Sequence, residues 1–240
     1  MTGAGPIGEG VAERWRAVSR RVAAACERAG RAPGEVTIVA VSKTHPADAV
    51  RAARAAGAVD FGENYAQELA QKVSELSADA VDAAGAAIRW HFIGRLQRNK
   101  ARLVAGKVAL VHAVDTVELA EELARRAGGV VQPILLAVNL AGETTKGGIT
   151  ADAAPAVARA IVALAGVSLD GLMTMPPPVD DPEASRPHFE GLRALRGRLS
   201  DELGRALPVL SMGMSHDYEV AIACGATHVR IGTAIFGDRG

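Results

Sequence analysis

A lysine directly after a predicted strand is the residue best placed to act as a nucleophile. The run 36–41, rich in valine and isoleucine, reads as a buried strand and leads straight into Ser42, Lys43 and Thr44. Burial beside such a wall disfavours the charged form of an amine. We therefore expect the pKa of Lys43 to fall, which would make it a nucleophile toward an aldehyde. On position alone, an exposed lysine at a strand end is the alternative.

Two segments that combine glycine with hydroxyl side chains follow the last two predicted strands. The first runs from Ser211 to Ser215 and the second from Arg230 through Gly232 to Thr233. In a (β/α)8 barrel, the loops after strands seven and eight are the usual phosphate site. Glycine lets backbone N–H groups approach the phosphate oxygens, and hydroxyls add donors. Each segment is a weak signal alone, but the pair predicts a phosphate site.

A nucleophilic lysine opposite a phosphate site suggests a ligand that carries both an aldehyde and a phosphate. Pyridoxal 5'-phosphate, held as a Schiff base, meets that description, and it needs a third group facing its pyridine nitrogen. Arg230 is placed for this third role. A salt-bridged arginine at the barrel rim is the alternative reading of Arg230.

The elements that must position these residues alternate along the chain. Eight short, mostly apolar runs are each followed by an alanine-rich amphipathic stretch, an α/β pattern. The predicted strands are 36–41, 59–61, 88–93, 108–114, 133–140, 167–173, 208–212 and 227–231. The predicted helices lie near 46–57, 63–77, 96–105, 116–127, 151–165, 182–204 and 215–224. This count and length match a single (β/α)8 TIM barrel; a doubly wound sheet is the competing architecture.

One extra helix, at about 8–30, precedes the first strand. Its apolar residues Val11, Trp15, Val18, Val22 and Cys26 fall on one face, and arginines fill the other. We expect it to pack outside the barrel, with a partner-binding helix as the alternative. Residues 1–240 are predicted to form one domain.

Other polar residues also follow predicted strands. For Asn64, Asp115 and Asn139, helix capping is the alternative to a functional role. His91 has no carboxylate or serine partner at a telling spacing, so no catalytic role is predicted for it.

Composition narrows the classes of partner. The 27 basic residues balance 27 acidic residues and aromatic residues make up 3%, which argues against nucleic acid as a partner. No signal peptide and no apolar run of about 20 residues is visible, so we expect no membrane partner and a cytoplasmic location. Two cysteines and six scattered histidines suggest neither a disulfide framework nor a metal site. No interface motif stands out, and a monomer is expected.

The sequence closely resembles the YggS/PROSC family of pyridoxal phosphate homeostasis proteins, from about residue 11 to residue 237. The motifs that carry the resemblance are those at 40–44 (AVSKT), 61–65 (FGENY), 90–94 (WHFIG), 96–100 (LQRNK), 171–173 (GLM), 210–215 (LSMGMS) and 230–237 (RIGTAIFG). This family has a barrel like the N-terminal domain of bacterial alanine racemases. The resemblance therefore implies a barrel that binds pyridoxal phosphate.

The resemblance also implies roles for individual residues. Lys43 matches the lysine that carries the cofactor, and Arg230 matches the arginine that faces the pyridine nitrogen. Ser215, Gly232 and Thr233 match phosphate contacts.

A second set of residues matches family positions near the cofactor, but the match gives them no specific role: Asn64, Met173 and Ser211. Asn139 is added on its position after the fifth strand. The sequence departs from the family pattern at His45 and His216, both expected at the rim of the site, and at its C-terminal residues.

The site favours a protein that holds and hands over pyridoxal phosphate, with cofactor-dependent apo-enzymes as recipients. The alternative is a weak amino-acid racemase, which needs a proton donor on each face of the substrate carbon. Lys43 serves one face, but the chain has only Tyr65 and Tyr218 and shows no second domain to supply the other. Arg230 also leaves the pyridine nitrogen unprotonated, which weakens the ring as an electron sink. A further hypothesis makes Lys146, on the loop 143–148, a transient acceptor as the cofactor leaves Lys43.

Overall fold

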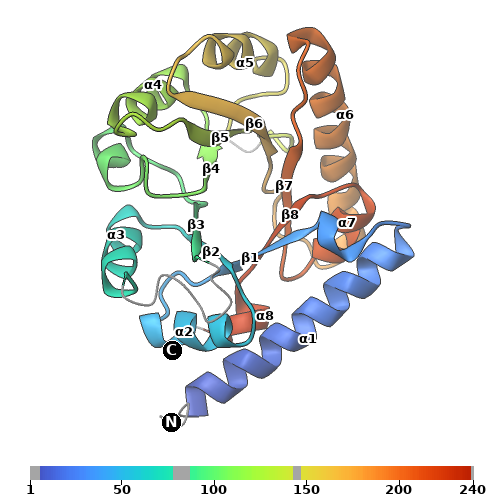
Figure 1. Cartoon of the computed structure of the whole chain (residues 1–240). Coiled ribbons are helices and arrows are strands. Elements are labelled where there is room, and N and C mark those ends of the chain that lie inside the picture. Colours follow the sequence, from blue (N-terminus) through green and yellow to red (C-terminus); the bar gives the residue numbers. More distant parts are fainter. Residues whose placement is uncertain (1–5, 78–86, 143–146, 239–240) are drawn as a thin grey trace.

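Eight parallel strands close into a barrel in their order along the chain (Figure 1). The computed structural model describes residues 6–77, 87–142 and 147–238. The strands are β1 (Thr37–Val41), β2 (Asp60–Glu63), β3 (Arg89–Phe92), β4 (Leu110–Val114), β5 (Gln132–Ala137), β6 (Val167–Met173), β7 (Val209–Met214) and β8 (His228–Ile231). The first and last strands pair, with Thr37 opposite His228. The predicted (β/α)8 barrel is confirmed, and the doubly wound sheet is excluded.

Helices surround the barrel (Figure 1). They are α2 (Ala47–Ala55), α3 (Ala66–Glu75), α4 (Val117–Arg126), α5 (Ala154–Val162), α6 (Arg186–Leu203), α7 (Tyr218–Ala223) and α8 (Thr233–Phe236), with 3-10 turns η1 (Pro33–Glu35), η2 (Arg98–Leu103) and η3 (Pro182–Ser185). The helix predicted at 96–105 is the 3-10 turn η2. Its buried residue Ala101 and the buried Val104 that follows the turn lie three positions apart, a spacing that shares one face in a 3-10 helix.

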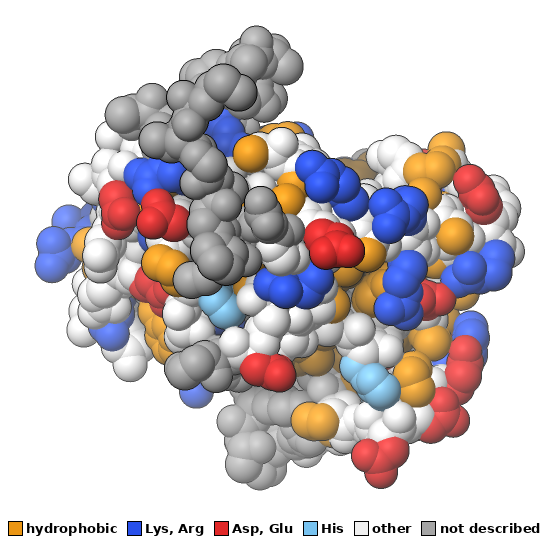
Figure 2. All heavy atoms as spheres, turned by 90° about the horizontal axis from the view of Figure 1, so that it is seen from below, with side chains coloured by type: hydrophobic (Ala, Val, Ile, Leu, Met, Phe, Trp, Pro, Cys, Tyr) orange, Lys and Arg blue, Asp and Glu red, His pale blue; other side chains and the backbone are white. Residues whose placement is uncertain are grey.

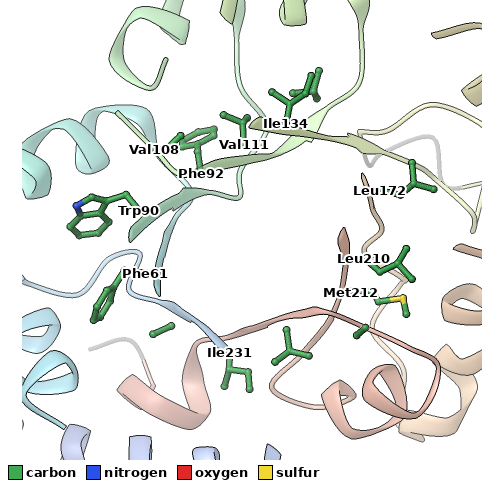
Figure 3. Close-up of a cluster of buried hydrophobic side chains, with 14 of the residues drawn as sticks. Phe61, Trp90, Phe92, Val108, Val111, Ile134, Leu172, Leu210, Met212 and Ile231 are labelled. Atoms are coloured by element: carbon green, nitrogen blue, oxygen red, sulfur yellow. The ribbon is translucent and has the colours of Figure 1, made fainter. Parts of the chain in front are cut away.

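The main apolar core lies between the strands and the helices. Figure 3 shows its side chains, among them Trp90, Phe92, Leu210 and Met212, on the outer side of the strands. Since successive residues of a strand point to opposite faces, the residues between them must point into the barrel. A smaller apolar cluster, made of Leu110, Leu135, Ala137 and Met173, is separate from this core.

Helix α1 (Pro6–Arg28) runs along the outside of the barrel past α2, α7 and α8, as predicted (Figure 1). Its apolar face is buried from Val11 to Cys26. On its polar face, Arg14 donates to the carbonyl oxygens of Ile235 (2.8 Å) and Phe236 (3.2 Å) in α8. The N-terminal helix is thereby fastened to the last helical turn of the barrel.

Within the described part of the chain, no helix combines the length and the apolar character needed to cross a membrane. On the face shown in Figure 2, basic and acidic side chains are intermingled.

Candidate functional site

A cavity of about 310 Å³ opens at the carboxyl ends of strands β1, β2, β7 and β8. It brings together six of the predicted site residues: Lys43, Asn64, Ser215, Arg230, Gly232 and Thr233. Its volume falls at the lower end of the range typical of small-ligand sites. We refer to it below as the mouth cavity.

Lys43 lies between two residues that are anchored to other elements. On one side, the Ser42 hydroxyl donates to Glu63 Oε1 at 2.6 Å. On the other, the Thr44 N–H donates to Glu68 Oε1 at 2.6 Å. Thr44 has a φ of +66°, a left-handed conformation that is costly for a β-branched residue and persists only where its surroundings impose it. The loop therefore holds the Lys43 backbone in a defined place at the cavity.

A buried cation holds these anchors together. The Lys72 amino group donates to Glu63 Oε1 (2.7 Å), to Glu68 Oε1 (2.8 Å) and to the Ser42 carbonyl oxygen (2.7 Å). Burial raises the pKa of Glu63, and the nearby Lys72 opposes that rise. Lys72 is thus a structural lysine beside the loop, distinct from the half-buried Lys43.

The two predicted phosphate segments meet at one wall of the mouth cavity. The Gly232 N–H donates to Ser215 Oγ at 3.2 Å, which joins the end of β8 to the end of β7. Within β7, Gly213 has a φ of +91°, and a Cβ there would lie 2.6 Å from the side chain of Ala221. Only glycine fits this close turn. Ser215 and Thr233 both line this wall of the cavity, and each carries a hydroxyl group.

Arg230 enters the cavity from inside the barrel. It is buried, and its guanidinium donates to Ser211 Oγ at 2.6 Å and to the Thr174 carbonyl oxygen at 3.0 Å. Burial lowers the pKa of Arg230 to about 10, and the charge of Asp217 works against that shift. Arg230 is therefore still a cation at neutral pH, and its guanidinium can only donate hydrogen bonds.

Three predicted residues are not among the described residues that line the mouth cavity: Ser211, Met173 and Asn139. Ser211 lies behind Arg230, as its hydrogen-bond partner. Met173 belongs to the smaller apolar cluster. The Asn139 N–H donates to the Ile149 carbonyl oxygen at 2.8 Å. Lys146 lies outside the described residues.

Two histidines that the sequence placed at the rim do line the cavity. His45 stacks on Phe236 with 5.3 Å between ring centroids, and the Nε2 of His216 lies 3.0 Å from the Asp180 carbonyl oxygen. Met175 and Met214 also line the cavity and were not predicted. Their signal in the sequence was only their position: Met175 lies just beyond β6, and Met214 is the last residue of β7.

Spacing along the sequence showed no carboxylate or serine partner for His91, but the fold gives it a carboxylate partner. Its Nε2 lies 2.8 Å from Asp60 Oδ1, and its Nδ1 lies 2.9 Å from His112 Nε2. His112 in turn lies 2.8 Å from Ser211 Oγ through its Nδ1. These partners come from neighbouring or opposite strands of the barrel, so spacing along the sequence did not reveal them.

No three histidine, cysteine, aspartate or glutamate side chains in the described ranges are grouped so that they could hold a metal ion.

Comparisons with known proteins agree with this architecture. The family model described as alanine racemase, N-terminal domain, matches residues 15–240. The chain is 44% identical over 229 residues to the pyridoxal phosphate homeostasis protein of Aquifex aeolicus, covering 95% of this chain and 97% of the relative. It is 44% identical over 231 residues to the protein of that name from Pseudomonas aeruginosa, covering 95% and 96%. The structure of PipY from Synechococcus elongatus with pyridoxal phosphate bound superposes with a TM-score of 0.82 at 34% identity, covering 95% of this chain and all of the other.

Proposed function

The chain belongs to the family of pyridoxal phosphate homeostasis proteins, with the barrel of the alanine racemase N-terminal domain, and on that premise we propose how it handles the cofactor. It binds pyridoxal 5'-phosphate as a Schiff base on Lys43. It acts in pyridoxal phosphate homeostasis by holding the cofactor and releasing it to cofactor-dependent apo-enzymes.

The observation that carries this proposal is the mouth cavity itself. Residues that carry an amine, a buried guanidinium and two hydroxyl groups line one cavity of about 310 Å³. The amine of Lys43 suits the aldehyde carbon. The hydroxyl groups of Ser215 and Thr233 suit the phosphate oxygens. Gly232 belongs to the same phosphate site, where its N–H donates to Ser215 Oγ and so holds that side chain in place.

The donor set also fits the third group of the cofactor. A guanidinium donates and does not accept hydrogen bonds, so Arg230 suits a ring nitrogen that keeps its lone pair. When bound, the cofactor supplies an aldehyde that reacts with amines. The protein's part is to hold the phosphate, orient the ring and present the Lys43 amine.

We include Asn64 in the binding site because it lines the mouth cavity at the end of β2. Gly94 fixes its backbone: a Cβ on Gly94 would lie 2.1 Å from the Asn64 carbonyl oxygen. Ser211 acts on the ring through Arg230. Met173 and Asn139 are proposed as nearby residues without direct contact.

A carrier is favoured over a racemase by the position of the tyrosines. Of the chain's two tyrosines, Tyr218 is buried on α7, and Tyr65 lines a neighbouring cavity of about 660 Å³. Neither is among the described residues lining the mouth cavity. The second proton donor that racemisation needs is therefore not supplied by a tyrosine beside Lys43.

Two measurements test the proposed function. Borohydride reduction of the loaded protein, followed by peptide mass mapping, should place the adduct on Lys43. Loaded protein should be mixed with an apo-enzyme that depends on this cofactor. It should restore that enzyme's activity faster than an equal amount of free cofactor, obtained from the loaded protein by dialysis, does. Formation of D-amino acids from a panel of L-amino acids would favour the racemase instead.

A further inference from the structure

A chain of hydrogen bonds crosses the interior of the barrel and ends at the mouth cavity. It runs from Asp60 at the start of β2 through His91 on β3 and His112 on β4 to Ser211 on β7 and Arg230 on β8. The four successive contacts measure 2.8, 2.9, 2.8 and 2.6 Å. All five side chains are buried.

Strand alternation places this chain inside the barrel. Trp90 and Phe92 point outward from β3 (Figure 3), so His91 between them points inward. In the same way, Leu210 and Met212 point outward from β7 and leave Ser211 inside. The polar chain therefore occupies positions that apolar side chains usually fill in such barrels. Buried polar groups are costly unless each has a partner, and here each one does.

The two end residues of this hydrogen-bond chain fix the direction in which its hydrogen bonds are donated. Arg230 only donates, and an ionised Asp60 only accepts. Burial acts to raise the pKa of Asp60, but hydrogen bonds from His91 and Arg89 outweigh it and hold that pKa below its ordinary value. Asp60 is therefore a carboxylate at neutral pH.

With a carboxylate at its end, the chain has one arrangement in which both linking imidazoles are neutral. His91 donates from Nε2 to Asp60, and His112 donates from Nε2 to His91 Nδ1. The hydroxyl of Ser211 donates to His112 Nδ1 and accepts from Arg230. Burial, together with the positive charge of Arg230, holds the pKa of His112 well below its usual value, in keeping with this neutral form.

Other charged groups face the chain at the amino-terminal end of the barrel. A cavity of about 280 Å³ there is lined by Asp60, Arg89, His91, Asp170 and His228. Arg89 donates to Asp60 Oδ2 at 2.6 Å. Burial lowers the pKa of His228 to about 4, so this histidine adds no charge at neutral pH.

We propose that His112, acting through Ser211, is a positioning residue for Arg230, and that Asp60 at the far end of the barrel sets the direction of the chain. Because Ser211 gives its proton to His112, its oxygen is fixed as an acceptor for the guanidinium. The remaining N–H groups of Arg230 are then held toward the pyridine nitrogen. This inference rests on the proposed function, since it concerns how the ring of pyridoxal phosphate is held.

The first test changes the end of the chain farthest from the mouth cavity. In Asp60→Asn, the new amide can donate as well as accept, so the direction of the chain is no longer fixed. We expect pyridoxal phosphate to bind about two- to thirtyfold more weakly. We also expect the pH profile of the visible absorbance of the bound cofactor to move. The matched control is Asp170→Asn, which alters a carboxylate at the same cavity that is not part of the chain, and it should behave like the wild type.

The second variant breaks the chain in its middle. His112→Phe removes both of its hydrogen bonds and should weaken binding about ten- to a hundredfold. Since this substitution could impair folding, thermal unfolding of the apo-protein accompanies it, and Asp60→Asn carries the test if the variant does not fold.

A third measurement needs no cofactor. In ¹⁵N-labelled apo-protein, two-bond nitrogen–proton couplings report which imidazole nitrogen carries the proton. Both His91 and His112 should carry it on Nε2. A proton on Nδ1 of His112 would reverse the chain and overturn the inference.

The outcomes separate this inference from the proposed function. If the wild type forms no adduct on Lys43, the proposed function fails, while the couplings still report on the chain. If the wild type binds the cofactor but Asp60→Asn matches Asp170→Asn in both affinity and pH profile, the positioning role fails and the proposed function stands.

Discussion

The amino group of Lys72 lies 2.7 Å from the carboxylate of Glu63, and both side chains are almost completely buried beside the loop that carries Lys43. Each member of this pair compensates the buried charge of the other, because either charge left alone in the interior would be strongly destabilising. The same lysine binds the carbonyl oxygen of Ser42. The stability of the fold and the placement of Lys43 are therefore linked through this pair.

Lys72→Met should lower the free energy of unfolding by about 3–5 kcal/mol, since it leaves the buried Glu63 without its partner. Urea unfolding of the apo-protein measures this change. Arg159→Met is the control: it breaks the exposed ion pair with Glu202 (3.2 Å), and such pairs contribute about 0–1 kcal/mol. Equal effects of the two substitutions would contradict a structural role for Lys72.

Lys43→Ala should abolish the main borohydride-reduced adduct while leaving the fold intact. Lys43 is half-buried at the cavity and outside the packed core, and such positions usually change stability by no more than about 0.5 kcal/mol. The variant should still bind pyridoxal phosphate non-covalently through the phosphate contacts, more weakly than the wild type does. Lys100→Ala, which changes a lysine of the neighbouring cavity, should keep the full adduct on Lys43. Finding the wild-type adduct mainly on another lysine would remove the basis of the site.

Pyridoxal, which lacks the phosphate, should bind far more weakly than pyridoxal phosphate. Each lost charge-assisted hydrogen bond weakens binding by about ten- to a hundredfold. Ser215→Ala and Thr233→Ala should each narrow the difference between the two aldehydes, as measured by equilibrium titration. Ser200→Ala, on α6 and away from the cavity, should leave it unchanged. Equal affinity of the wild type for both aldehydes would show that the phosphate lies elsewhere.

The apo-protein should lose stability as the pH falls below about 6.5, the ordinary value for a histidine. Burial lowers the pKa of His112 well below that value and the pKa of His228 to about 4. Below that pH the unfolded chain binds protons on these histidines and the folded chain does not. Each histidine therefore lowers the free energy of unfolding by about 1.4 kcal/mol for each pH unit of acidification. The free energy of unfolding is therefore not reduced by these histidines above about pH 6.5, and it falls progressively from there toward pH 4.

Urea unfolding at pH 7.5, 6.0 and 5.0 measures that slope. His228→Gln should make it shallower, because one of the two buried histidines is removed. A slope unchanged in the variant would show that His228 does not contribute.

The sequence predicted most of the barrel because its strands are short, apolar runs between amphipathic helices. It also predicted six residues of the mouth cavity, since polar groups at the ends of barrel strands converge by topology. The short helix α8 was missed, because four residues carry no periodic signal. The partners of His91 were missed for another reason: His112 and Asp60 are 21 and 31 residues away and meet it only through strand pairing.

The arginine of α1 that binds α8 has a consequence for the synthesis of the chain. Arg14 and Ile235 are 221 positions apart, yet they are hydrogen-bonded in the finished protein. The ribosome delivers α1 long before its partners on α7 and α8 exist. Its contact with α2 can form early, but its contacts with α7 and α8, and closure of the barrel by pairing of β1 with β8, must wait for the end of the chain. Until then the nascent chain exposes the apolar surface that α7 and α8 later cover, which is the kind of surface that makes a folding intermediate prone to aggregation.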